Sequence, residues 1–198
     1  MDNVHSIRTW LRATPVKNGM IELLNVSFEA DEPSFFGSPA EGKQKFFMSE
    51  DSYFNTKCSH AEFVKLDDSN GISDDHYAWR LLSNSNGLQY YQAISWLLRD
   101  KESRKATMYY NAQAHDGENP ACCTGGQFII RDNKLHYMVT YRSNDAVKAY
   151  ANDWAWHNLV HRMALIDLHK SYPDLKLGTM YWNVGSFHIY QQDLEGII

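Results

Sequence analysis

Apolar residues recur at helical spacing in three segments of the chain, and we predict a helix for each segment. The first two helices cover residues 4–13 and 88–100. The third begins at Asn152 or Asp153, because an Asn or Asp side chain favours a helix start, and it ends near His169. The side chains expected to face the core are Ile7, Trp10 and Leu11, then Leu88, Tyr91, Ile94 and Leu98, and finally Trp156, Leu159, Val160, Met163 and Ile166.

Alternating or continuous apolar runs predict strands, and turn-forming residues separate them. Strands are expected over residues 20–28, 105–111, 127–130, 135–141 and 177–190. The third and fourth of these form a hairpin around residues 131–134. Residues 30–42 and 67–87 are predicted loops, and residues 43–53 are weakly helical. Helices and strands are mixed without strict alternation, which favours an α/β or α+β fold in a single domain over residues 1–198.

Composition and charge restrict the classes of function. The 198 residues carry a formal net charge of −5 and contain no lysine- or arginine-rich run, so we expect no nucleic-acid polymer as a partner. Only three cysteines occur, and Cys122 and Cys123 are adjacent, where a bridge would be strained, so a disulfide scaffold is excluded. No apolar run approaches about 18 residues and no segment resembles a signal peptide. We therefore expect a soluble, cytoplasmic protein without a membrane partner.

Several residues have side chains suited to catalysis or binding, although each also has a purely structural interpretation. Cys122 lies shortly before Gly125 and Gly126, which permit close approach of the backbone to a ligand. It is therefore either a nucleophile or a small buried residue. Arg142 and Ser143 end a predicted strand, where they would clamp a phosphate or form an ordinary surface ion pair.

The remaining candidates are equally ambiguous when each is taken alone. Asp153 at a helix start is by default an N-cap. His188 and Tyr190 share one face of a strand, which suits two ligand-facing donors or a half-buried sheet face. Glu50 is a lone acid, and the pair Arg104-Lys105 is ordinarily solvated. Three histidines share the last helix, but no acid or cysteine completes a zinc pattern, so we expect no metal.

In combination, these residues form ordered motifs that resemble the thymidylate synthase superfamily. The motifs are residues 121–128, with a cysteine five residues before a glutamine, residues 142–145 (Arg-Ser-Asn-Asp), and residues 182–190 with a late His-x-Tyr. Residues 27–33 and 152–156 are most similar to the bacteriophage deoxycytidylate hydroxymethylase branch. The resemblance spans about residues 17–190. It implies a mixed β-sheet with helices packed on one face, and a sheet that is used for dimerisation.

The resemblance also implies a role for each candidate residue. Cys122 would attack carbon 6 of a pyrimidine nucleotide, after which carbon 5 takes a one-carbon unit from 5,10-methylenetetrahydrofolate. Tyr77 would sit near carbon 5, Glu50 would organise water for proton transfer, and Asp145 would meet the pterin. The remaining residues would bind the nucleotide. Arg142 and Ser143 would bind its phosphate, together with Arg104 and Lys105 from the other subunit of a homodimer with shared active sites. His188 and Tyr190 would bind its sugar.

Asp153 bears on the choice of base. It lies eleven residues after Arg142, where thymidylate synthases have an asparagine that reads uracil. Cytosine presents an acceptor at ring nitrogen 3 and an amino donor at carbon 4, and a carboxyl group that shares one proton matches both. The resemblance therefore implies hydroxymethylation of free dCMP with methylenetetrahydrofolate and water, in the host cytoplasm if the gene belongs to a phage.

Three alternatives remain open at this stage. A deoxycytidylate methylase would use the same site with hydride instead of water, and a deoxyuridylate-directed enzyme would share the fold. From another class, the chain would be a nucleotide- or RNA-binding relative without turnover. The sequence decides neither the final step nor the preference between deoxy- and ribonucleotides.

Overall fold

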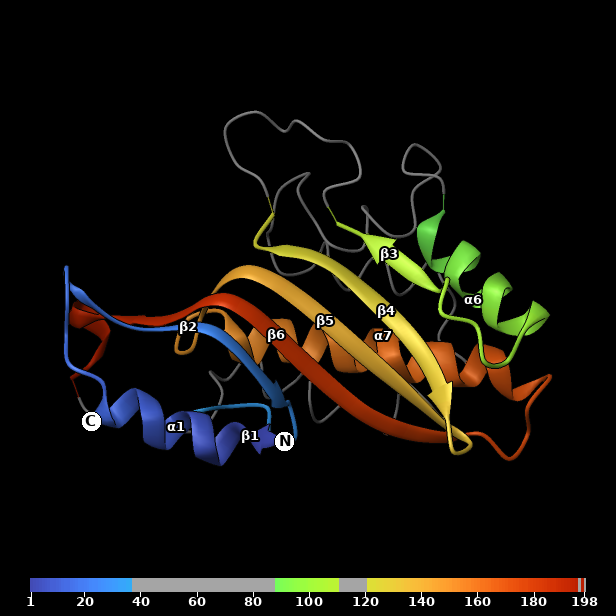
Figure 1. Ribbon diagram of the computed structural model, residues 1–198, viewed down its shortest axis with the longest axis horizontal. Helices are drawn as coiled ribbons and strands as arrows, with labels where there is room; N and C mark the ends of the chain where they lie inside the picture. Colours follow the sequence, from blue (N-terminus) through green and yellow to red (C-terminus); the bar gives the residue numbers. More distant parts are fainter. Residues whose placement is uncertain (37–87, 111–120, 196, 198) are drawn as a thin grey trace.

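The computed structural model describes residues 1–36, 88–110, 121–195 and 197, and their centre is a six-stranded mixed sheet (Figure 1). The strands are β1 (Asp2–Asn3), β2 (Met20–Glu29), β3 (Thr107–Tyr109), β4 (Cys123–Arg131), β5 (Lys134–Asp145) and β6 (Lys176–Tyr190). The helices are α1 (Val4–Ala13), α6 (Gln89–Arg99), α7 (Tyr150–His169) and a short 3-10 turn at Gln191–Asp193. The predicted α/β class is confirmed.

The strand order is β1-β2-β6-β5-β4-β3, and the sheet combines parallel and antiparallel neighbours. β4 and β5 form the expected antiparallel hairpin, while β5 and β6 run parallel and are joined through α7. β2 pairs antiparallel with β6, which brings a strand from the start of the chain beside its last strand. The carboxyl ends of β5 and β6 therefore meet at the same edge of the sheet.

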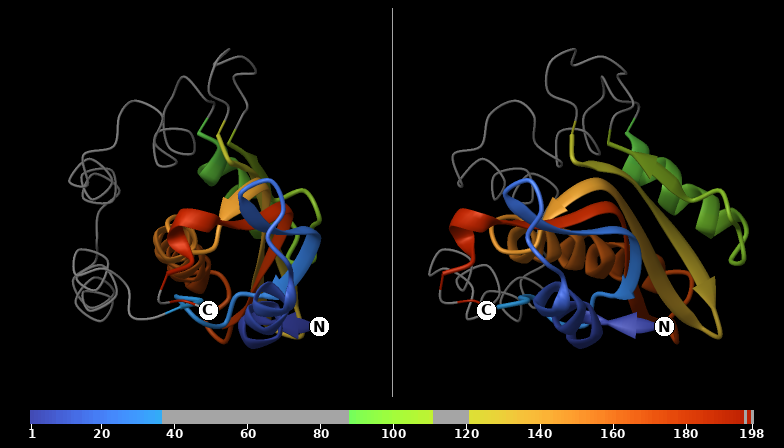
Figure 2. Two further views of the ribbon diagram at one scale, coloured as in Figure 1. Left: turned by 90° about the vertical axis from the view of Figure 1, so that its left-hand side faces the viewer. Right: turned by 60° about the vertical axis from the view of Figure 1, so that its left-hand side comes forward.

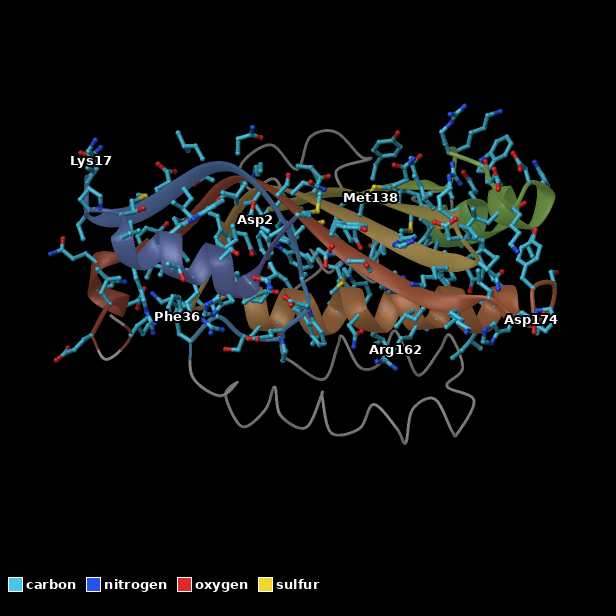
Figure 3. The ribbon with its side chains drawn as sticks, turned by 60° about the horizontal axis from the view of Figure 1, so that its bottom comes forward. Asp2, Lys17, Phe36, Met138, Arg162 and Asp174 are labelled. Carbon is cyan, nitrogen blue, oxygen red and sulfur yellow. The ribbon has the colours of Figure 1, made fainter. Side chains whose placement is uncertain are left out.

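Helix α7 runs along one face of the sheet, and the core lies between them (Figures 1 and 2). Alternate residues of β5 point into this core, as the period of a strand requires. Those residues are Leu135, Tyr137, Val139 and Tyr141, each nearly or completely buried. Met138 of β5 lies on the side of the sheet away from α7, whereas Arg162 projects from the outer side of the helix (Figure 3). On that face, which none of the described helices covers, Leu24 of β2 is 70% exposed.

The helices occur where the apolar spacing predicts them, but part of each predicted core face is wrong. Trp10, Tyr91, Leu98 and Ile166 are each between 38% and 46% exposed. In α6 the buried stripe is rotated by one position, because Gln89 turns inward and hydrogen-bonds both backbone groups of Tyr109. A polar side chain that completes a strand edge is invisible to a pattern of apolar residues.

The limits of the strands also differ from the prediction. β4 begins at Cys123 and β5 continues to Asp145, so the Arg-Ser-Asn-Asp motif forms the end of a strand. β3 is shorter than the predicted strand, and α7 begins at Tyr150. Residues 30–36 contain no helix or strand, as expected. The predictions for residues 43–53 and 67–87 lie outside the described residues.

Candidate active site

Cys122 stands immediately before β4 and its side chain is exposed, whereas that of Cys123 is buried. The backbone amide of Arg142 donates to the Cys122 carbonyl at 2.9 Å, which fixes the end of β5 beside this cysteine. The Nε atom of Arg142 also donates to the carbonyl oxygen of Ala121 at 3.3 Å. The structural alternative, a small buried residue, therefore describes Cys123 and is wrong for Cys122.

The ends of β5 and β6 bring four further candidates to the same edge. In the parallel ladder, Ser143 pairs with Ser186, and Asp145 pairs with His188. His188 is buried, and its Nδ1 atom has no hydrogen-bond partner among the described residues. The ring of Tyr190 lies 4.9 Å from that of His188. A buried imidazole nitrogen of this kind is costly unless a ligand or water satisfies it, which suits a ligand-binding role.

Asp145 has a definite structural role in the turn between β5 and α7. Its Oδ1 atom accepts the backbone amides of Val147 and Lys148 at 2.8 and 2.9 Å. The side chain is 9% exposed, so the fold holds this carboxylate in one position. The side chain of Lys148, the second of these two residues, forms an ion pair with Asp193, which follows β6.

Asp153 lies in the first turn of α7, and the expectation that it is the N-cap is wrong. The N-cap is Ala149, which has no side-chain capping bond, because the helix begins two or three residues earlier than predicted. The Oδ2 atom of Asp153 instead accepts a hydrogen bond of 2.7 Å from Nδ2 of Asn144. Both residues are buried, so α7 and the end of β5 are joined by a bond that serves no helix terminus.

A buried histidine one turn after Asp153 was missed by the sequence analysis as a site neighbour. Nδ1 of His157 lies 3.0 Å from the Tyr137 hydroxyl, and Nε2 lies 2.9 Å from the Tyr141 hydroxyl and 3.8 Å from Sγ of Cys123. Burial lowers the pKa of His157 to about 3, so the ring is neutral at physiological pH. The one available signal was the spacing of four residues from Asp153 on a helix.

The same burial determines the state of the second cysteine. It raises the pKa of the Cys123 thiol well above its ordinary value, and the nearby Asp153 charge raises it further. A thiol in this environment stays protonated and is a poor nucleophile. Of the two adjacent cysteines, only Cys122 has the exposure that a reacting group needs.

The structure does not bring Arg104 and Lys105 to this cluster within one chain. The carbonyl of Arg104 accepts a bond from the side chain of Gln127, five residues beyond Cys122 in sequence, or about 17 Å along an extended strand. The Lys105 ammonium lies 4.7 Å from the ring centroid of Trp96. Both side chains are exposed. The other two expected site residues, Glu50 and Tyr77, lie outside the described residues.

Two further observations concern the described part of the chain. Within residues 1–36, 88–110 and 121–195, no group of three His, Cys, Asp or Glu side chains lies close enough to hold a metal ion. Among the same residues, no helix has the length and apolar character needed to cross a membrane.

The described residues thus combine a mixed α/β sheet with an exposed cysteine and with polar residues at the ends of β5 and β6. The thymidylate synthase family matches residues 60–198, and the chain belongs to that family. It is 30% identical over 190 residues to the deoxycytidylate 5-hydroxymethyltransferases of Enterobacteria phages T6 and T4, covering 87% of this chain and 76% of each relative. It is also 32% identical over 95 residues to the thymidylate synthase of Francisella philomiragia, covering 48% of this chain and 33% of that protein.

Proposed function

We propose that the protein hydroxymethylates carbon 5 of dCMP, using 5,10-methylenetetrahydrofolate and water to give 5-hydroxymethyl-dCMP and tetrahydrofolate. The observation that carries this proposal is the buried carboxyl group of Asp153, which accepts a hydrogen bond from Asn144. The resemblance implies that this residue reads the base. The phage relatives are deoxycytidylate 5-hydroxymethyltransferases, which supports the same substrate and the same reaction.

Asp153 bears on the choice between cytosine and uracil because the two bases present opposite edges. Uracil offers a donor at nitrogen 3 and an acceptor at oxygen 4, which the amide of an asparagine matches. Cytosine offers an acceptor at nitrogen 3 and a donor at its amino group. A carboxyl group that shares one proton with nitrogen 3 satisfies both cytosine atoms. That proton also withdraws electrons from the ring and so favours attack at carbon 6.

The nucleophile in this proposal is Cys122. Attack by its thiolate on carbon 6 makes carbon 5 nucleophilic, and the covalent adduct divides one difficult step into easier ones. Arg142 and Ser143 bind the 5′-phosphate, for which guanidinium and hydroxyl groups supply complementary donors. His188 and Tyr190 bind the sugar hydroxyl, and the unsatisfied Nδ1 atom of His188 supports a ligand at this position.

Methylenetetrahydrofolate supplies the one-carbon unit. Asp145 is the residue that we expect to accept hydrogen bonds from the amino and ring N–H groups of a pterin. The two backbone amides on its Oδ1 atom hold the carboxylate still for this task. Glu50 is assigned to organise the water for proton transfer, and Tyr77 is assigned to lie near carbon 5 of the base.

We further propose a homodimer with shared active sites. The face of the sheet that none of the described helices covers carries exposed apolar area such as Leu24, which suits burial against a second copy. Arg104 and Lys105 lie far from Cys122 of their own chain, beside Gln127 on β4. In the dimer they reach the phosphate that is bound in the site of the other subunit. Their solvent exposure in the single chain supports this role.

One assay tests the proposed reaction. The protein is incubated with methylenetetrahydrofolate and dCMP, CMP or dUMP, and the products are identified by mass. We expect 5-hydroxymethyl-dCMP together with tetrahydrofolate. A 5-methyl product with dihydrofolate would instead establish the deoxycytidylate methylase, and modification of dUMP alone would establish a deoxyuridylate-directed enzyme.

The remaining rival is a nucleotide- or RNA-binding relative without turnover. A covalent adduct of Cys122 with a 5-fluoropyrimidine nucleotide and folate, detected by mass, would exclude it. Nucleotide binding without adduct or product would overturn the proposed reaction.

A further inference from the structure

Asp153 is connected to the core by a chain of two hydrogen bonds. The indole Nε1 of Trp182 donates to Oδ1 of Asn144 at 3.3 Å, and Nδ2 of Asn144 donates to Oδ2 of Asp153 at 2.7 Å. Trp182 is completely buried, and Asn144 is 2% exposed. The three residues come from β6, β5 and α7, which are the elements that meet at the candidate site.

The direction of this chain follows from the chemistry of the groups. An indole N–H is a donor only, so the atom of Asn144 that faces Trp182 must be its carbonyl oxygen. The amide nitrogen then necessarily faces Asp153, which settles the usual ambiguity in the orientation of an asparagine. Oδ2 of Asp153 therefore always receives a hydrogen bond, and it is disfavoured as the oxygen that carries a proton.

This direction matters because a carboxyl group with one proton does not by itself select cytosine. With the proton on one oxygen it matches the cytosine edge, and with the proton on the other oxygen it matches the uracil edge. We propose that Trp182 and Asn144 are positioning residues that hold Oδ2 of Asp153 as an acceptor, so that the site accepts cytosine nucleotides and rejects uracil nucleotides. The inference rests on the proposed function and deepens it. Oδ2 then meets the cytosine amino group, and the shared proton lies between Oδ1 and nitrogen 3.

The packing of Trp182 supports a fixed direction. Its ring stacks on that of Tyr141 at 5.0 Å between centroids and meets the edge of His157 at 5.3 Å. The indole therefore lies between β5 and α7 in the close-packed core, where a change of its orientation would disturb these contacts. Because the indole N–H of Trp182 is a fixed donor, it fixes the orientation of the Asn144 amide, which in turn determines the oxygen of Asp153 that accepts a hydrogen bond.

Equilibrium binding of dCMP and dUMP, measured by calorimetry without folate, tests the inference. In Asn144→Ala the carboxyl proton can occupy either oxygen, so the preference for dCMP over dUMP should fall about tenfold, as expected for loss of a hydrogen bond to a carboxyl group. The fall should come largely from relatively stronger dUMP binding. A residue that merely supports the fold would weaken both nucleotides equally.

Trp182→Phe keeps an aromatic ring and frees the Asn144 amide to rotate, so the preference should fall in the same direction. The double variant should show no lower preference than Asn144→Ala alone, since Trp182 acts through Asn144. Trp156→Phe is the matched control: this indole is also buried and donates to the Tyr110 hydroxyl, and its loss should leave the preference unchanged.

Two results separate failure of this inference from failure of the proposed function. If the unmodified protein binds neither nucleotide, or prefers dUMP, the proposed function fails. If it prefers dCMP but folded Trp182→Phe and Asn144→Ala keep that preference, or weaken both nucleotides equally, the positioning role is overturned. Should Asn144→Ala not fold, Trp182→Phe against its control decides the question alone.

Discussion

The sulfur of Cys123 lies 3.8 Å from Nε2 of His157, in a cluster closed to solvent, while the preceding residue, Cys122, is exposed. Two adjacent cysteines thus have opposite environments, since one is buried and the other is exposed to solvent. Since the strand begins at Cys123, its side chain turns into the core, and Cys122 remains at the edge where β5 ends. This difference separates the proposed nucleophile from a structural thiol.

Replacement of each cysteine by serine should therefore have unequal effects. Cys122→Ser should reduce product formation to background, because an un-ionised hydroxyl is a far weaker nucleophile than a thiolate. Cys123→Ser should keep activity within about tenfold, since a hydroxyl can still hydrogen-bond His157. Turnover with dCMP and methylenetetrahydrofolate, measured by product mass, checks both. An inactive Cys123 variant beside an active Cys122 variant would show that the nucleophile has been assigned to the wrong neighbour.

The second prediction concerns assembly. If Arg104 serves the phosphate site of the other subunit, Arg104→Ala and Cys122→Ala should each be inactive or nearly so alone. Mixed in equal amounts, they should recover up to about a quarter of the unmodified activity, because half of the dimers are mixed and one of their two sites draws intact residues from both chains. Subunit exchange is verified by native mass spectrometry of differently tagged chains. Exchange without any recovery would argue against a shared site.

The third prediction concerns stability at low pH. Burial lowers the pKa of His157 to about 3 and that of His161 to about 4, against an ordinary value of 6.5. The unfolded chain therefore binds more protons than the folded protein below about pH 6.5. The contribution of these histidines to the free energy of unfolding has its full value above that pH. It falls as the pH drops towards 4, by up to about 1.4 kcal/mol per pH unit for each histidine.

Urea unfolding at several pH values measures this loss. His157→Gln removes one of the histidines whose pKa burial lowers, so its unfolding free energy should depend less steeply on pH between 6.5 and 4. The exposed His5 provides a control, since His5→Gln should keep the slope of the unmodified protein. A slope unchanged in His157→Gln would mean that this ring is not held neutral by burial.

These features show which parts of the molecule the sequence could predict. Helix α1 and strand β2 follow from local periodicity, which operates within a few residues. The start of β4 at Cys123 and the end of β5 at Asp145 do not, because these polar positions become strand only through pairing with distant segments. The resemblance implied that Cys122 and Arg142 serve one site, and a backbone hydrogen bond of 2.9 Å joins the two residues.

The polar interior of the site was not predictable from the same patterns. His157 and Asn144 are polar residues that resemble surface positions in the sequence, yet both are buried and fully engaged by partners far along the chain. Which polar side chain is buried depends on whether a distant partner satisfies it, and periodicity carries no such information.

The last prediction concerns base choice directly. Asp153→Asn should shift preference from dCMP towards dUMP, because an amide cannot transfer a proton to nitrogen 3 of cytosine and so loses the electron withdrawal that favours attack at carbon 6, whereas nitrogen 3 of uracil already carries a proton. A hydrogen bond to a charged group contributes about 1.5–3 kcal/mol, so loss of the proton-sharing interaction should lower the ratio of kcat/KM for dCMP over dUMP by about ten- to a hundredfold. Asp145→Asn is the matched comparison: it also exchanges a buried carboxylate for an amide, but should impair use of the folate cosubstrate and leave the ratio between the bases unchanged.

Because the Asp153 side chain does not cap α7, Asp153→Asn should unfold at nearly the temperature of the unmodified protein, and a large loss of stability would point to a structural role instead. An unchanged ratio in a folded Asp153→Asn protein would remove the main reason for choosing cytosine over uracil.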